Sequence, residues 1–243
     1  MERSIHFSRA NITIHGILTR SVPHSKCLII LVHGLADHSN THVLFNAARV
    51  FPKYGFDTFR FDLYNVNNGS ALSGQSIRKQ IRQLSVILGH FRTKYKHLVL
   101  LGHSFGCPLI AAIPSVRCVK TIIFWNPSLH PSLVIHSCFQ PKGWHKYICS
   151  GAIDVIISQK FVQEAKAFPS FSTLFCKELP PIGIITGGQA GAQIGQEQYY
   201  DVIRGKKRIF NIPRTGHCFD EHRAEDVLFK RTVEWLSLSD SAW

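Results

Sequence analysis

The stretch LVLLGHSFGC, residues 98–107, indicates the fold more strongly than any other part of this 243-residue chain. Four apolar residues typical of a buried strand lead directly into Gly102-His-Ser104-Phe-Gly106, and an apolar helical run follows. A serine with a glycine two residues away on either side is typical of a tight turn between strand and helix. Such a turn lifts the serine hydroxyl clear of the sheet and places the Phe105 N–H at a helix N-terminus. We therefore interpret Ser104 as a candidate nucleophile and the Phe105 amide as a candidate oxyanion donor.

Around this turn, short apolar runs alternate with longer amphipathic ones, which predicts a mostly parallel sheet covered by helices. We expect strands at residues 12–18, 27–32, 56–61, 98–101, 121–124, 182–186 and 207–212, the first of them at the sheet edge. One helix should follow an N-cap at Ser39 or Asn40 and stop at Pro52. A second should follow Ser76 and carry a basic outer face, and a last one should span residues 224–238.

The chain length and the 45% hydrophobic content suit one folded domain with a substantial core. Residues 1–126 and 182–243 are expected to form this α/β core, because the interval 127–181 is too long for a loop between two core strands. We predict that residues 127–181 form an inserted cap (lid). Seven of its aromatic residues either roof an apolar pocket or pack the cap on the sheet: Phe139, Trp144, Tyr147, Phe161, Phe168, Phe171 and Phe175.

Two further loops follow predicted strands and carry chemistry. His33-Gly-Leu35 follows the buried strand 27–32, where Gly34 permits a sharp turn and the Leu35 N–H can act as a second oxyanion donor. His33 itself is expected to hold this loop. His217 follows the last predicted strand, at the carboxyl edge of the sheet, and is the candidate general base for Ser104.

Together these stretches resemble the α/β hydrolases over nearly the whole chain. The matching segments are Val32-His-Gly-Leu35, Phe59-Arg-Phe-Asp62, Gly102-His-Ser-Phe-Gly106 and Ile212-Pro-x-x-Gly-His217-x-Phe, in family order. The chain is most similar to the small capped branch that contains serine esterases like monoacylglycerol lipases and feruloyl esterases. The resemblance implies a lipase-like esterase in which Ser104 is the nucleophile, His217 is the base, and the Leu35 and Phe105 backbones form the oxyanion hole.

Two segments depart from the family pattern. The segment after Asp62 lacks the family's usual Gly-rich turn, so we expect a different loop beside the pocket. The third triad member should be an Asp near Ala190, but residues 187–195 contain no carboxylate. Since a triad Asp made neutral costs a well-studied protease roughly 10⁴ in turnover, we expect weak or differently supported activity.

Several substitutes for the acid remain open. Asn126 ends a predicted strand at a place from which some α/β hydrolases supply their acid, and it could orient His217 as a neutral amide. Gln189 or Gln193 could do so from the usual loop. The charged alternatives are Glu197, Asp201 and Asp220, for which surface solvation or helix capping is the simpler role, and Asp154, which lies in the cap.

The charge is strongly positive, at +13, and residues 63–153 contain ten Lys or Arg but no Asp or Glu. We expect one positive face that favours anionic esters or surfaces, although a basic composition by chance is the simpler reading. No nucleic-acid motif is present, and neither a cofactor nor a metal is expected. Seven dispersed cysteines and the absence of a signal-peptide pattern or a long apolar run predict a soluble cytoplasmic protein with reduced thiols.

These features predict a hydrolase that cleaves carboxylic esters with small acyl or aryl groups. The reaction is expected to pass through an acyl-enzyme on Ser104. Two alternatives stay open. In the first, the chain is a weakly active or inactive hydrolase-fold protein that lacks the triad acid and serves as a binding protein. In the second, it is an acyltransferase that uses the same serine.

Overall fold

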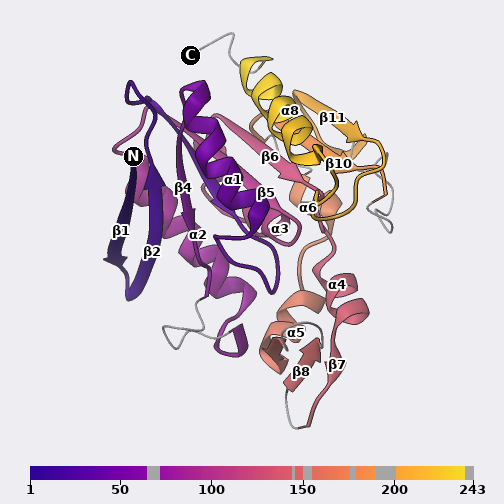
Figure 1. Ribbon diagram of the computed structural model, residues 1–243. Helices are drawn as coiled ribbons and strands as arrows, with labels where there is room; N and C mark the ends of the chain where they lie inside the picture. Colours follow the sequence, from indigo (N-terminus) through magenta and orange to yellow (C-terminus); the bar gives the residue numbers. More distant parts are fainter. Residues whose placement is uncertain (65–71, 144–145, 150–154, 176–178, 190–200, 239–243) are drawn as a thin grey trace.

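An eight-stranded, mostly parallel sheet forms the centre of the molecule (Figure 1). The computed structural model describes residues 1–64, 72–143, 146–149, 155–175, 179–189 and 201–238. The strand order is β1-β2-β4-β3-β5-β6-β10-β11, in which β2 pairs antiparallel with β1 and β4 and the other neighbours are parallel. The strands are Glu2–Arg9 (β1), Ile12–Thr19 (β2), Cys27–Val32 (β3), Asp57–Phe61 (β4), His97–His103 (β5), Thr121–Trp125 (β6), Ile182–Gly187 (β10) and Lys207–Ile212 (β11). The predicted mostly parallel sheet is confirmed.

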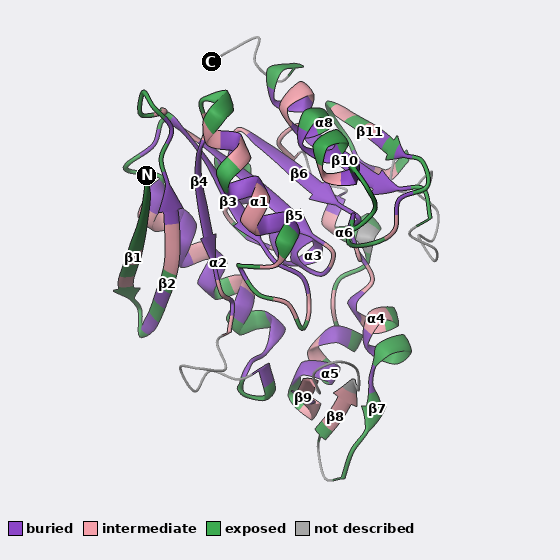
Figure 2. Cartoon of the chain, viewed as in Figure 1, coloured by how far each residue is buried: buried purple, intermediate pink, exposed green. Residues whose placement is uncertain are grey.

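Helices cover both faces of this sheet. The α-helices are His42–Val50 (α1), Ile77–Phe91 (α2), Gly106–Ala111 (α3), Pro131–Cys138 (α4), Gln159–Lys166 (α5), Phe171–Phe175 (α6) and Ala224–Leu238 (α8), and single 3₁₀ turns span Phe51–Tyr54 (η1), Leu72–Gly74 (η3) and Val116–Cys118 (η4). Figure 2 shows that the central strands are buried along most of their length. Strands buried on both faces read as continuous apolar runs, which is why β3 is so uniformly hydrophobic.

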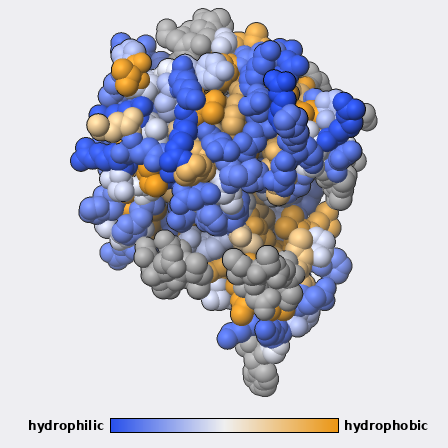
Figure 3. All heavy atoms as spheres, viewed as in Figure 1, coloured by the Kyte–Doolittle hydropathy of each residue, from blue (hydrophilic) through white to orange (hydrophobic). Residues whose placement is uncertain are grey.

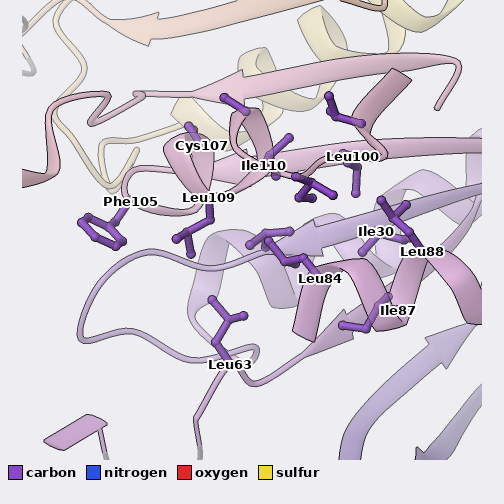
Figure 4. Packing of buried hydrophobic residues seen from close by; sticks show 14 of the residues in the cluster. Ile30, Leu63, Leu84, Ile87, Leu88, Leu100, Phe105, Cys107, Leu109 and Ile110 are labelled. Atoms are coloured by element: carbon purple, nitrogen blue, oxygen red, sulfur yellow. The ribbon is translucent and has the colours of Figure 1, made fainter. Parts of the chain in front are cut away.

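Alternate residues of each central strand belong to two separate cores. Ile30 and Leu100 pack with α2 and α3, whereas Ile29 and Leu101 pack with α1 and α8. Figure 4 shows the first of these cores, in which Leu84 of α2 and Ile110 of α3 meet the sheet from neighbouring helices. Because α3 begins two residues after Ser104, this packing fixes the direction in which the serine turn leaves the sheet.

The helix signals in the sequence hold with one correction. Ser76 caps α2, its hydroxyl accepting a hydrogen bond from the Lys79 N–H at 3.2 Å, and α8 has the predicted bounds. The N-cap of α1 is Thr41, so the prediction of Ser39 or Asn40 is wrong. Instead, the Ser39 N–H donates to the Asp62 carboxylate at 2.7 Å, which commits that residue to the loop before the helix.

The sheet edge also differs from the prediction. Strand 12–18 was expected at the edge, but β1 pairs with it on the outside over its whole length, so β2 is an inner strand. Only Ile5 and Phe7 of β1 are even partly buried, and the rest of the strand is exposed. With so little apolar alternation, β1 carries no strand signal in the sequence.

The interval 127–181, expected to be an inserted cap, contains elements of its own. The strands Gln140–Pro141 (β7), Lys146–Cys149 (β8) and Val155–Ser158 (β9) form a small antiparallel sheet beside α4 and α5. Figure 1 shows these elements together below the central sheet, joined to it through β6 and α6.

Among the described side chains of this interval, three aromatic ones are buried. Phe161 of α5 stacks on Phe105 with ring centroids 5.9 Å apart, and Phe175 of α6 meets Phe124 of β6 edge-on at 6.1 Å. Phe139 is 5% exposed. Of the other aromatic residues expected there, Tyr147 and Phe168 are partly buried, while Trp144 and the Phe171 side chain lie outside the described residues. The buried rings thus pack the interval against the core, as one of the two readings expected.

Candidate active site

Ser104 stands on a strained turn between β5 and α3. Its φ is +52°, a left-handed conformation that costs a non-glycine residue about 1–2 kcal/mol. The turn is pressed closely against the neighbouring strand, because a Cβ at Gly106 would lie 2.6 Å from the Val32 carbonyl oxygen. The Ser104 N–H donates to the Trp125 carbonyl at 2.9 Å, which ties the turn to β6. The turn has the geometry expected of a nucleophile elbow, in which Ser104 is the candidate nucleophile.

His217 comes to this serine from the far edge of the sheet. It lies on the loop after β11, and its Nε2 is 2.9 Å from the Ser104 Oγ. The two residues are 113 positions apart in the sequence. A neutral imidazole at this distance can accept the hydroxyl proton, as a general base must. The structure therefore brings together the two residues that the sequence singled out.

Asn126 fixes the backbone of the loop after β11 that carries His217, called the histidine loop below. Its side-chain amide is fully buried and donates to the carbonyl oxygens of Gly216, at 3.1 Å, and His217, at 2.9 Å. Its Oδ1 accepts a hydrogen bond from the Gly187 N–H at 2.8 Å. Asn126 thus links the ends of β6 and β10 to the loop that carries the candidate base.

His103, the residue before Ser104, is a neighbour of His217 that no sequence signal marked as functional. Its buried ring donates from Nε2 to the His217 carbonyl oxygen at 3.1 Å, and the two imidazole rings are 5.3 Å apart. Burial lowers the pKa of His103, so the ring is neutral at pH 7. Its position inside the GxSxG stretch was the only available signal.

The pKa of His217 is lowered to about 4, first by burial and second by the neighbouring His103. The ring nevertheless keeps an exposed surface, and solvent screening moderates such a shift. The direction follows from the surroundings, which offer no carboxylate contact to His217 among the described residues. His217 is therefore unprotonated at pH 7 and ready to accept a proton.

A second hydroxyl lies beside the candidate nucleophile, Ser104. The Ser128 Oγ is 3.2 Å from the Ser104 Oγ, and the Ser128 N–H donates to the Ser104 carbonyl at 3.1 Å. If the Ser104 proton is directed to His217, the Ser128 hydroxyl is the donor in the contact between the two oxygens. No sequence pattern marks Ser128, because its contact depends on how the chain turns after β6.

The loop after β3 lies against Ser104. A Cβ at Gly34 would be 3.2 Å from the Ser104 Cβ, so Leu35, the candidate oxyanion donor, follows a residue in close contact with the elbow. His33 is fully buried and uses both ring nitrogens: Nδ1 donates to the Gly34 carbonyl at 2.8 Å, and Nε2 accepts from the Leu63 N–H at 3.0 Å. His33 thus joins this loop to the segment after β4, in agreement with the holding role expected for it.

The expected position of the triad acid, Ala190, lies outside the described residues, as do Gln193, Glu197 and Asp154. Gln189 donates its backbone N–H to the Thr215 carbonyl at 2.8 Å, which brings the loop after β10 alongside the histidine loop. Asp220 pairs with His42 at 2.8 Å, and Asp201 is exposed. Most of the unusual segment after Asp62, residues 65–71, is also outside the described residues.

Within the described residues, no group of three or more His, Cys, Asp or Glu side chains is arranged to hold a metal ion. No described helix combines the length and the apolar character needed to cross a membrane.

Comparisons with known proteins find structural likeness only. No family model and no curated protein sequence matches the chain. Among solved structures, Est1E from Butyrivibrio proteoclasticus matches with a TM-score of 0.78 and 15% identity, over 96% of this chain and 99% of that one. The structure of Est1E with ferulic acid bound matches equally well.

Two further solved structures agree. The α/β hydrolase GrgF from Penicillium sp. sh18 matches with a TM-score of 0.74 and 13% identity, over 98% of this chain and 99% of that one. A soluble variant of monoglyceride lipase from Saccharomyces cerevisiae matches with a TM-score of 0.73 and 12% identity, over 97% and 94%. The expected α/β-hydrolase fold is confirmed, and at these identities the likeness is one of fold.

Proposed function

From the α/β-hydrolase fold of this chain we propose that it is a serine hydrolase of carboxylic esters. The observation that carries the proposal is the 2.9 Å contact between Nε2 of His217 and Oγ of Ser104, with Ser104 held at a φ of +52° between β5 and α3. A strained serine beside a neutral histidine is the arrangement that acyl transfer through a serine requires.

The reaction has two halves. In the first, the Ser104 Oγ attacks the ester carbonyl while its proton passes to Nε2 of His217, and the N–H groups of Leu35 and Phe105 bind the oxyanion. His217 then protonates the leaving alcohol, which departs and leaves an acyl group on Ser104. In the second half, water gives its proton to His217 and attacks the acyl carbonyl, so the carboxylic acid leaves and Ser104 recovers its proton.

The acid of a full triad would come from around Ala190, just after Gln189, whose backbone N–H donates to the Thr215 carbonyl of the loop that carries His217. Without a carboxylate there, Asn126 and His103 position His217 through its backbone carbonyl, and the imidazolium formed during the reaction is less stabilised. We therefore propose an active but slow esterase.

For the substrate, we propose small acyl or aryl esters bound beneath residues 127–181, which act as a cap. Two observations support this. Phe161 of that segment stacks on Phe105, directly beside the nucleophile. In Figure 3, hydrophobic residues gather between the core and the α4–α5 part of the segment. The aryl acid named with Est1E is compatible with such a surface.

A fluorophosphonate probe tests the nucleophile directly, because it reacts with activated serines without needing the right substrate. We expect labelling of the wild-type protein at Ser104, identified by peptide mass spectrometry, and no labelling of Ser104→Ala. The exposed residue Ser137, in α4, provides the control, since Ser137→Ala should label as the wild type does. A folded wild-type protein that resists the probe would contradict the proposal and favour the binding protein that the missing acid suggests.

Hydrolysis of p-nitrophenyl acetate and butyrate tests the reaction itself. Release of nitrophenol should depend on both Ser104 and His217. Added alcohols distinguish the acyltransferase alternative, because an acyltransferase would form the new ester in preference to the free acid.

A further inference from the structure

A pocket of about 490 Å³ lies between the turn that joins β1 to β2 and the outer side of α2. Arg9, the last residue of β1, and Ala10 of the turn line it on one side, and Arg82, Val86 and Gly89 line it from the helix. It shares no residue with the candidate active site. Its volume is within the range of small-molecule sites and far exceeds that of a single inorganic ion.

Three arginines surround this pocket: Arg9, Arg82 and Arg92. The Arg82 guanidinium is held in place because its Nη2 donates to the Ala10 carbonyl oxygen at 3.2 Å. The Arg9 guanidinium lies over Gly89, where a Cβ would be 3.2 Å from its Nη1. A glycine inside a helix costs about 1 kcal/mol relative to alanine, and here it leaves the space that the guanidinium occupies.

The polar side chains of the pocket, which are set among apolar surface, are mainly hydrogen-bond donors. Its two hydroxyl groups already donate to backbone carbonyls, from Ser85 to Ile81 at 3.1 Å and from Thr93 to His90 at 3.4 Å. None of the three arginines forms an ion pair with a carboxylate within the described residues. The free donors are therefore guanidinium groups, which match the planar oxygen pairs of phosphate and carboxylate groups.

The surrounding surface has the same charge. Arg82 and Arg92 belong to the 91-residue stretch without Asp or Glu. A second pocket, of about 540 Å³, is lined by Arg3, Arg20 and Lys94 and by His90, the residue that follows Gly89 in α2. Positive charge concentrated around a hollow raises the local concentration of anions.

We propose that the pocket between the β1–β2 turn and α2 binds a ligand that carries two or more phosphate groups. Three arginine side chains line the pocket, and their summed positive charge exceeds the charge of about −2 on one phosphate group. The pocket also has room for a larger body than a single phosphate. Two sources share this chemistry, a soluble oligophosphate and a phosphorylated lipid headgroup, and the experiment separates them.

Isothermal titration calorimetry with sodium tripolyphosphate, at low and at physiological salt, measures binding to the full chain. We expect saturable one-to-one binding to the wild type. The double variant Arg9→Gln/Arg82→Gln should bind about ten-fold more weakly or worse, because it loses two charge-assisted contacts. The control Lys53→Gln/Arg78→Gln removes the same charge from exposed sites outside the pocket and should bind within about two-fold of the wild type.

Gly89→Leu provides a test in which the charge does not change. Leucine is a better helix former than glycine, so the variant should fold, but its side chain displaces the Arg9 guanidinium and should weaken binding as the double variant does. Equal losses in the double variant and in its control, or unchanged binding by Gly89→Leu, would overturn the proposal, as would a wild type that binds no tripolyphosphate.

The source is tested by co-sedimentation with phosphatidylcholine vesicles, with and without phosphatidylinositol bisphosphate. Sedimentation that needs the phosphorylated lipid and is lost in the double variant assigns the pocket to a headgroup. Tripolyphosphate binding without sedimentation assigns it to a soluble ligand.

Discussion

The Asn126 side-chain amide donates to the carbonyl oxygen of His217 at 2.9 Å and thereby holds the backbone of the candidate base. Both hydrogens of this amide are used, since the second goes to Gly216. The position at the end of β6 from which some α/β hydrolases supply an acid is thus occupied here by a donor. An acid at this place could not make the same two contacts.

Asn126→Asp is therefore expected to lower activity. The carboxylate would face two carbonyl oxygens, and the lost hydrogen bonds together with the buried charge should cost about 1–3 kcal/mol of stability or more. We expect a lower melting temperature and a lower kcat on p-nitrophenyl butyrate. The exposed Asn11, in the turn between β1 and β2, changed to Asp, is the matched control. Higher activity in Asn126→Asp would instead mean that residue 126 substitutes for the triad acid at the ring.

Ser128→Ala tests the second hydroxyl beside the nucleophile. The variant removes the hydrogen bond to the Ser104 Oγ but leaves the Ser128 N–H bond to the Ser104 carbonyl in place. A neutral hydrogen bond contributes about 0.5–1.5 kcal/mol, so kcat should fall about two- to ten-fold with little change in melting temperature. Fluorophosphonate labelling should slow by a similar factor. A kcat equal to that of the wild type would show that the contact has no part in the reaction.

Gly106→Ala should destabilise the elbow. The added Cβ would come within 2.6 Å of the Val32 carbonyl oxygen and 2.8 Å of the His33 carbonyl oxygen, and both belong to backbone that cannot yield easily. We expect a loss of about 1–3 kcal/mol or more, measured by chemical denaturation. Gly74→Ala is the control, because nothing lies within 4 Å of its added Cβ. Equal stabilities of the two variants would contradict the tight packing of the elbow against β3.

Helices and strands whose apolar residues form one clear pattern, either a continuous run or a helical repeat, could be predicted from the sequence. Strand β3 and helix α8 have the expected bounds, because β3 is buried on both faces and α8 covers one face of the sheet. The exposed edge strand β1 and the short strands β7 to β9 could not. Their pairing is decided by contacts with neighbouring segments, and their sequences lack the periodic apolar pattern from which a strand could be predicted.

The candidate site divides in the same way. Ser104 and His217 were predictable because each follows a strand, and the carboxyl ends of parallel strands meet at one edge of the sheet. The roles of His103 and Ser128 were not, since their contacts depend on side-chain directions at the ends of β5 and β6. The backbone contacts of Asn126 likewise depend on how close the histidine loop comes to β6.

The pH dependence of ester hydrolysis tests the state of His217. The imidazole can accept the Ser104 proton only when it is neutral, so activity should be present above its pKa and lost as the pH falls through it. Burial and His103 lower this pKa to about 4, and solvent at the exposed edge moderates the shift. We expect the acid limb of kcat/KM between about 4 and 6. An acid limb near 7 would contradict this and indicate a carboxylate beside Nδ1, such as that of Glu197.

The stability of the fold should also depend on pH, through His33. Its pKa is lowered by burial, and its neutral ring accepts a hydrogen bond from the Leu63 N–H that the protonated ring could not accept. As the pH falls below 6.5, the ordinary pKa of histidine, His33 is protonated in the unfolded chain but stays neutral in the folded chain. The free energy of unfolding should therefore decrease between pH 7.5 and pH 5, and urea denaturation at both values measures the decrease. His33→Asn should show a smaller decrease than the wild type, whereas the exposed control His136→Asn should match the wild type. An identical decrease in all three proteins would assign the pH dependence to other groups.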